Sequence, residues 1–280
     1  MALRNTDSNL FLQKKAHKFK FYFYESQNYS VYPQNKNERI IYGIAMDIPY
    51  GINMGYLYGV NSAHPANMRL TNGYDLFGWV MRMSSVPSFW GRYITGKNRL
   101  TSEEIGFLHE NDCGIALIFN DLTEEIVSTS NGIEDGLRAA NAAKLIGAPK
   151  HYGIAIFAEI KDDWSVNHNW MISYTNAVLD SGFIPGFIAN TDSSKNFNFG
   201  RQCSHYAEFM GDIAYNSTVY WATEPKLDSE PENWTPYCPS KLKPDNIDIW
   251  RTRASISYGD SISVDKNYIR DESHTRFLWK

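Results

Sequence analysis

Short apolar runs alternate with helical stretches from residue 73 to the end of the chain, and this pattern most constrains the fold. Strands alternating with helical segments predict βαβ units and a parallel sheet. Buried parallel strands read as short continuous apolar runs, which is the form seen here. A short start at 73–76 and a run at 262–264 bring the expected strands to eight. The other six runs are 90–94, 113–119, 154–160, 183–189, 219–222 and 247–250.

Helices are expected between these runs, with recognisable start and stop signals. Thr101-Ser-Glu-Glu104 is a capping box, in which the Thr hydroxyl and the Glu side chain satisfy free backbone amides. A helix over 132–146 should end at Gly147 and Pro149. A third helix is expected over 166–181. The inner stripe predicted for the helix over 132–146 is Ile133, Leu137, Ala140 and Leu145.

The first 70 residues differ from the rest and are interpreted as an N-terminal extension, with a barrel-type domain over 71–280. Residues 1–40 carry seven basic and three acidic residues. This segment either packs on the main domain or is a docking arm for a protein partner or an anionic surface; short basic runs are usually solvated faces. Residues 41–72, rich in Gly, Tyr and Asn, predict irregular loop.

Charge and cysteine content exclude several functions. The net charge of −4 argues against a dedicated nucleic-acid binder. Three scattered cysteines without a Cys-x-x-Cys pair predict neither a disulfide scaffold nor a zinc site. No signal peptide and no membrane span is expected. We therefore expect synthesis in the cytoplasm, with release by lysis, a phage particle or a secretion device if the target lies outside. No metal or organic cofactor is implied.

Acidic residues at the ends of the expected strands are the strongest functional signal. In a parallel barrel, side chains at the carboxyl ends of strands converge on one pocket. Carboxylates converging there suit glycosidic cleavage, which needs one acid to protonate the leaving oxygen and a second group opposite. The alternative for each acid is a helix cap or a turn. The acids in question are Asp75, Glu159, Asp162, Asp163, Asp192, Asp248 and Asp265, accompanied by the aromatic residues Tyr93, Trp164, Trp221 and Trp250.

The order of the motifs resembles glycoside-hydrolase-like domains of unknown function, which are related to the lysozymes (muramidases) of glycoside hydrolase family 25. The resemblance covers roughly residues 70–270. It begins with Gly73-Tyr-Asp75, Gly91-Arg-Tyr93 and Leu100-Thr-Ser-Glu-Glu-Ile105. It continues through the strand at 153–159, Asp248-Ile-Trp250 and Val264-Asp265-Lys-Asn267. The resemblance implies a TIM-like (β/α)8 barrel that hydrolyses sugar polymers such as peptidoglycan.

Site residues follow from the resemblance position by position. Asp75 matches the acid of the first strand, Glu159 the proton donor of the fourth, and Asp265 the acid of the last. The lysozymes carry Asp-x-Glu on the fourth strand, where this chain has Phe157-Ala-Glu159, so one carboxylate is missing, and Asp162 or Asp163 is a candidate replacement. Substrate contacts are expected from Arg92, Tyr93, Asn190, Trp221 and Trp250.

Two functions remain open on the sequence. The first is a glycosidase acting on β-linked amino-sugar polymers. The second is a catalytically degenerate module that binds glycan, or a structural component docked through the N-terminal extension. The incomplete acidic motif and the additional 70 residues favour the second, whereas the set of acids at strand ends favours the first.

Overall fold

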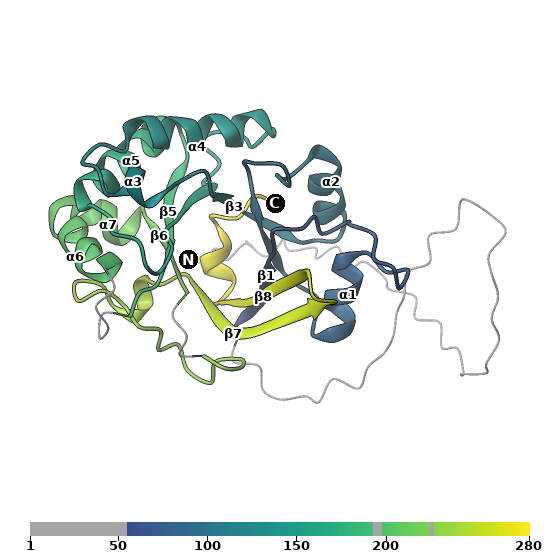
Figure 1. Ribbon diagram of the computed structural model, residues 1–280. Helices are drawn as coiled ribbons and strands as arrows, with labels where there is room; N and C mark the ends of the chain where they lie inside the picture. The colour runs from purple at the N-terminus through teal and green to yellow at the C-terminus, as the bar shows by residue number, and fades with distance from the viewer. Residues whose placement is uncertain (1–54, 193–197, 224–226) are drawn as a thin grey trace, which may run out of the picture. The chain divides into compact units, whose positions relative to one another are not determined.

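A computed structural model of the chain describes residues 55–192, 198–223 and 227–280 (Figure 1). The internal contacts divide the chain into a unit at Met1–Pro49 and a unit at Tyr50–Lys280. The first unit lies outside the described residues, and so does the partner surface predicted within residues 1–40.

The described unit is a closed barrel of eight strands arranged in sequence order. Strands β1 to β7 run parallel to one another, whereas β8 is antiparallel to both β7 and β1. The TIM-like barrel is confirmed, with one antiparallel strand in the closing position. The strands are β1 (Leu57–Asn61), β2 (Phe89–Tyr93), β3 (Gly114–Phe119), β4 (Ala155–Glu159), β5 (Ile184–Ala189), β6 (Val219–Ala222), β7 (Ile249–Tyr258) and β8 (Ile262–Ile269).

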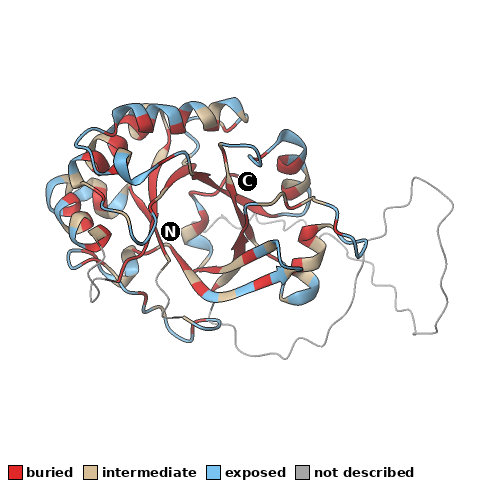
Figure 2. Cartoon of the chain, viewed as in Figure 1, coloured by how far each residue is buried: buried red, intermediate tan, exposed pale blue. Residues whose placement is uncertain are grey.

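Helices cover the outside of the barrel along most of its circumference (Figure 1). They are α1 (Leu76–Met83), α2 (Ser102–Glu110), α3 (Glu124–Val127), α4 (Ile133–Leu145), α5 (His168–Asp180), α6 (Asn198–Met210) and α7 (Asp212–Asn216), with 3-10 turns η1 (Pro244–Asn246) and η2 (Glu272–Thr275). Strands β2 to β6 are buried almost throughout, whereas β7 and β8 carry exposed residues, and the helices expose their outer faces (Figure 2). Beyond the barrel, β7 and β8 extend together as a long antiparallel hairpin.

The first strand is not where the sequence predicted it. Residues 73–76 do not form a strand, because Asp75 is the N-cap of α1 and its carboxylate accepts a 2.7 Å hydrogen bond from the Gly78 amide. The first strand is β1, within residues that the sequence assigned to irregular loop and to the N-terminal extension. Gly59 explains the misassignment. A Cβ there would lie 2.1 Å from a ring carbon of Phe89, so the close packing requires a glycine. In the sequence, such a glycine indicates a loop more than a strand.

The buried face of α4 also differs from the prediction. Of the predicted inner stripe only Ala140 is buried, whereas Ile133, Leu137 and Leu145 are exposed. The face that packs against the barrel and α5 consists of small residues, with Gly136, Ala139 and Ala143 among them. Small side chains let two helices approach closely. The helix α4 therefore packs through these small residues and not through the apolar stripe that hydrophobic periodicity predicted.

Substituting Gly136 with alanine is expected to destabilise the protein by about 1–3 kcal/mol, the range for overpacking. The new Cβ would lie 2.7 Å from Ala177 Cβ and 2.8 Å from the carbonyl oxygen of Tyr174, so the backbone of α4 or α5 must shift. The matched control is Gly106→Ala on α2, where a Cβ meets nothing within 4 Å. That variant should be more stable by about 0.5–1 kcal/mol. Urea unfolding of both checks the prediction, and equal stabilities would contradict it.

Candidate functional site

Alternation of side chains along the strands places one set of polar residues inside the barrel. The interior of the barrel is filled by an apolar cluster, called the inner cluster below, that includes Phe89, Phe157, Trp221 and Ile249. Side chains alternate along a strand, so residues two positions further along these strands also face inward. Because β8 is antiparallel, its first half lies beside the carboxyl ends of the other strands, and Asp265 pairs with Asn61. The residues gathered at this end, called the mouth cluster below, are Asn61, Tyr93, Glu159, Arg251 and Asp265.

A fixed floor lies beneath the mouth cluster. The ring of Trp221 contacts Phe157 edge-on, with a centroid separation of 5.4 Å, and its Nε1 donates a 2.8 Å hydrogen bond to Asn267 Oδ1. Asn267 Nδ2 in turn donates to Asn61 Oδ1 at 2.9 Å. Gly91 leaves the space that Trp221 needs, since a Cβ there would lie 2.7 Å from the indole. Buried hydrogen bonds therefore hold Asn61 in one orientation.

Glu159 ends β4 and is partly exposed at the mouth. The Tyr93 hydroxyl donates a 3.3 Å hydrogen bond to its Oε1. Burial raises the pKa of Glu159 above its usual value; the Arg251 charge, the Tyr93 hydrogen bond and the Lys161 charge oppose this, and the Asp265 charge adds to it. Glu159 therefore keeps its proton to a higher pH than an ordinary glutamate, as a general acid requires.

Tyr93 is a hydrogen-bond donor over the whole physiological pH range. Burial is the main cause that raises its pKa to about 12, and the negative charge of Glu159 adds to the effect. The hydroxyl thus stays protonated and restrains the orientation of the Glu159 carboxyl group.

Arg251 and Asp265 form a loose ion pair on the opposite side of the mouth. Nη1 of Arg251 lies 3.7 Å from Asp265 Oδ2, and Nη2 donates a long 3.4 Å hydrogen bond to Asn61 Oδ1. Asn61 Nδ2 donates to Asp265 Oδ2, also at 3.4 Å. Both charged groups act electrostatically on Glu159, which places two carboxyl groups and one guanidinium at the same barrel mouth.

A second polar group lies at the same end of the barrel, on the loops that follow β4, β5 and β6. Asp162 accepts hydrogen bonds from Asn190 Nδ2 at 3.3 Å and from Thr223 Oγ1 at 3.4 Å. Asn190 Oδ1 accepts from the Asp192 amide at 2.9 Å. The structure thus brings Tyr93, Glu159 and Asp265 into one cluster and Asp162 with Asn190 into another.

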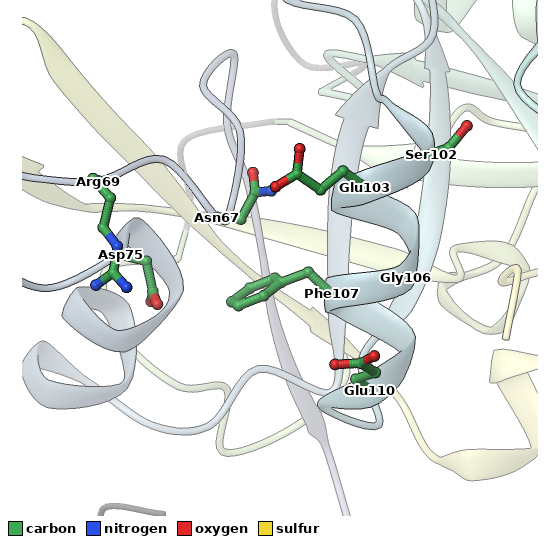
Figure 3. A pocket seen from close by; sticks show the side chains of 8 residues that line it. All are labelled: Asn67, Arg69, Asp75, Ser102, Glu103, Gly106, Phe107 and Glu110. Carbon is green, nitrogen blue, oxygen red and sulfur yellow. The ribbon is translucent and has the colours of Figure 1, made fainter. Parts of the chain in front are cut away.

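Asp75 lies away from the mouth. It lines an open pocket of about 490 Å³ between α1 and α2, on the outside of the barrel. Figure 3 shows Asp75 and Arg69 on one side of this pocket, opposite Glu103, Phe107 and Glu110 of α2. The expected convergence of Asp75 with the other acids is wrong, because Asp75 caps a helix instead of ending a strand.

Three of the expected substrate-contact residues are buried packing residues. Arg92 and Trp250 face outward from their strands into the layer between barrel and helices, whereas Trp221 lies below the mouth with no exposed surface. Arg92 forms a buried ion pair with Glu104, with Nε to Oε1 at 2.6 Å. The expectation that these residues line an open groove is therefore wrong.

Asn61, Arg251 and Asn267 belong to the site but were not predicted from the sequence. The alternation of side chains along a strand could have identified Arg251, because Ile249 faces the inner cluster and the residue two positions later must face the same way. Asn61 was hidden with its strand in the glycine-rich segment. Asn267 was quoted only as part of a motif, and its role follows from the pairing of β8.

Asp248 stands at the start of β7, at the end of the barrel opposite the mouth. It accepts a 3.0 Å hydrogen bond from the Tyr220 amide. Burial raises the pKa of Asp248 from 3.8 to about 7, against the hydrogen bond from Tyr220 and the positive charges of Arg276 and Arg270. This acid therefore belongs to the packing of β6 and β7.

The raised pKa of Asp248 predicts a pH-dependent stability. Between pH 4 and pH 7 the folded state binds this proton more tightly than the unfolded state, so the contribution of Asp248 to the free energy of unfolding falls as pH rises through this window. Asp248→Asn should remove the dependence. Urea unfolding at pH 5 and pH 8 should show the variant gaining stability relative to the wild type at the higher pH. An unchanged difference between the two proteins would contradict the assignment.

Within the described ranges, no group of three or more His, Cys, Asp or Glu side chains is arranged to hold a metal ion. Among the same residues, no helix is long and apolar enough to cross a membrane.

Comparison with known proteins supports the fold. No protein-family model and no curated protein sequence matches the chain. Among solved structures, an uncharacterized B. stearothermophilus protein is 23% identical, with a TM-score of 0.67 over 80% of this chain and 100% of that one. The Mycobacterium tuberculosis Tat-secreted protein Rv2525c, in complex with L-tartrate, is 14% identical, with a TM-score of 0.52 over 81% of this chain and 100% of that one.

A bacterial lysozyme from Streptomyces coelicolor is 10% identical, with a TM-score of 0.49 over 79% of this chain and 95% of that one. At these identities the comparisons establish the fold and no activity. The chain shares its barrel fold with the B. stearothermophilus protein and with Rv2525c, which agrees with the TIM-like architecture that the sequence predicted.

Proposed function

We propose that the protein is a glycosidase that cleaves β-linked amino-sugar polymers such as peptidoglycan, with Glu159 as the proton donor. The observation that carries this proposal is the setting of Glu159. It ends a barrel strand at the mouth, its pKa is raised by burial, and the Tyr93 hydroxyl orients its carboxyl group. The resemblance of the motif order to glycoside hydrolase family 25 supports the substrate class.

The proposed reaction uses two carboxyl groups. Protonated Glu159 gives its proton to the glycosidic oxygen while the bond between this oxygen and the anomeric carbon breaks. Asp265 stabilises the positive charge that develops at that carbon. Water then adds to the anomeric carbon, and its proton returns to the Glu159 carboxylate. Asp162, held by Asn190 and Thr223, takes part in orienting the sugar.

A glycan-binding barrel without catalysis is the second candidate. The specific observation in its favour is Asn61, which ends β1 inside the mouth cluster and supplies an amide where the resemblance implied an acid on the first strand. Fewer carboxyl groups then remain for catalysis, while the hydrogen-bonding groups needed for sugar binding are retained.

Incubation with purified peptidoglycan tests the proposal, with the release of reducing ends as the readout. We expect soluble fragments with new reducing ends from the wild-type protein. Sedimentation of the protein with the polymer but no release of product would favour the glycan-binding candidate. No release from peptidoglycan or chitin and no binding to either would contradict both candidates.

A further inference from the structure

Helix α4, on the outside of the barrel, exposes three large apolar side chains, called the α4 stripe below (Figure 1). Ile133, Leu137 and Leu145 are 48%, 45% and 86% exposed, and Leu145 is the most exposed large apolar side chain among the described residues. Their spacing of four and eight residues keeps all three within about a third of the helix circumference. The large apolar residues of α4 therefore form one outward-facing surface.

The opposite side of α4 already has its partners. Gly136, Ala139 and Ala143 are buried there, and α4 packs chiefly against α5 and β4. The α4 stripe thus adds nothing to this packing. Single apolar side chains scattered on a surface are ordinary, whereas several gathered on one face mark a surface for association.

Charges of opposite sign lie at the two ends of the α4 stripe. Glu134, in the first turn, is exposed and has no ion pair or hydrogen bond to another described residue. Lys144 lies in the last turn, and Lys150 follows six residues later. Burial and the positive charge of Lys150 lower the pKa of Lys144, so the two lysines lie close together. Neither lysine has an acidic partner among the described residues.

We propose that the protein forms a two-fold dimer in which the α4 stripes of two copies pack against each other with the helices antiparallel. A two-fold interface uses the same surface on both copies, so that surface must be complementary to itself. Antiparallel packing meets this requirement, because it covers apolar residues with apolar residues and places the acidic end of one helix beside the basic end of the other. It also brings opposite ends of the two helix dipoles together.

This dimer does not depend on the proposed function. Helix α4 lies outside the barrel and carries none of the residues of the mouth cluster. Turnover and dimer formation are therefore separate readouts, and either proposal can fail while the other stands.

The size of the surface sets the expected strength of the dimer. Helix α4 has 13 residues and is about 20 Å long. A contact between two such helices falls in the class below about 1,200 Å², which holds weak and transient complexes. We therefore expect a reversible dimer with a Kd of about 10–100 μM.

Sedimentation velocity of the full chain over this concentration range tests the dimer. The wild-type protein should change from monomer to dimer as its concentration rises. Leu137→Glu and Leu145→Glu each place an unpaired charge within the contact and should raise the Kd about tenfold or more. Leu145 is 86% exposed, so its substitution should leave the fold intact. The matched control is Phe209→Glu on α6, where a 74% exposed apolar side chain outside the α4 stripe is changed and the Kd should stay the same.

Charge reversal tests the antiparallel arrangement. Glu134→Lys makes both ends of the α4 stripe positive, and the double variant Lys144→Glu/Lys150→Glu makes both ends negative, so each should dimerise more weakly than the wild type. An equimolar mixture of the two pairs opposite charges at both ends and should associate more tightly than either variant alone. Thermal melting checks that every variant folds.

Four results would overturn the inference. They are a wild-type protein that stays monomeric over the whole range, an unchanged Kd in Leu145→Glu, an equal loss in Phe209→Glu, and a mixture of charge variants that associates no more tightly than its components.

Discussion

Replacing Glu159 with glutamine is expected to lower the turnover of peptidoglycan by about 10²–10⁴-fold, the range for loss of general acid–base catalysis. Glutamine has the shape of glutamate and still accepts the Tyr93 hydrogen bond, but it has no proton to give to the leaving oxygen. The floor of Trp221, Asn267 and Asn61 does not depend on Glu159, so the variant should fold normally. Reducing-end release at matched protein concentrations measures the effect.

The control for this prediction is Glu134→Gln, an exposed glutamate in the first turn of α4. It makes the same chemical change on the outside of the barrel and should leave turnover unchanged. Retained turnover in Glu159→Gln would show that another group protonates the leaving oxygen. Loss of turnover together with loss of polymer binding would indicate a damaged site instead of a missing proton.

The pH profile gives a second readout of the same group. Protonated Glu159 is the active form, so turnover should fall as pH rises through its pKa, which burial has moved above the usual range. Tyr93→Phe removes a hydrogen bond that favours the charged carboxylate and should shift this fall to higher pH. An unchanged pH profile would contradict the role given to Tyr93.

The sequence was sufficient to predict the order of most strands and the position of Glu159, because buried parallel strands leave continuous apolar runs. It was not sufficient for β1. The packing of Phe89 against Gly59 is a long-range contact that only a glycine permits, and a glycine in a sequence is usually taken to indicate a loop. Because β1 was not recognised in the sequence, Gly73-Tyr-Asp75 was assigned to the first strand in its place. Asn61 could then not be recognised as the residue at the mouth.

The facing direction of site residues was predictable in part. Arg92 and Tyr93 are neighbours on one strand and must point to opposite faces, so both cannot line one groove. Tyr93 faces Glu159, and Arg92 faces α2. The same counting separates Trp250 from Arg251. The alternation of side chains does not predict that β8 is antiparallel, and it is this direction that brings Asp265, near the start of its strand, to the mouth.

Arg92→Met is expected to lower the free energy of unfolding by about 3–5 kcal/mol, the cost of breaking a buried ion pair from one side. Arg92 and Glu104 have no exposed surface, and their hydrogen bonds join β2 to α2 and to the loop after β1, where the Ala66 amide donates to Glu104 at 2.7 Å. Methionine fills much of the arginine volume but leaves the Glu104 carboxylate buried without its cation. Urea unfolding measures the loss.

The double variant Arg92→Met/Glu104→Gln separates the lost cation from lost packing. Glutamine removes the stranded charge and still accepts from the Ala66 amide, so the double variant should be more stable than Arg92→Met alone. The control is Arg253→Met at the exposed pair with Asp228, which should cost no more than about 1 kcal/mol. If Arg92→Met were no more damaging than Arg253→Met, the buried pair would not be what holds α2 against the barrel. Recovery in the double variant would instead show that the uncompensated Glu104 charge, more than the missing side-chain volume, causes the loss.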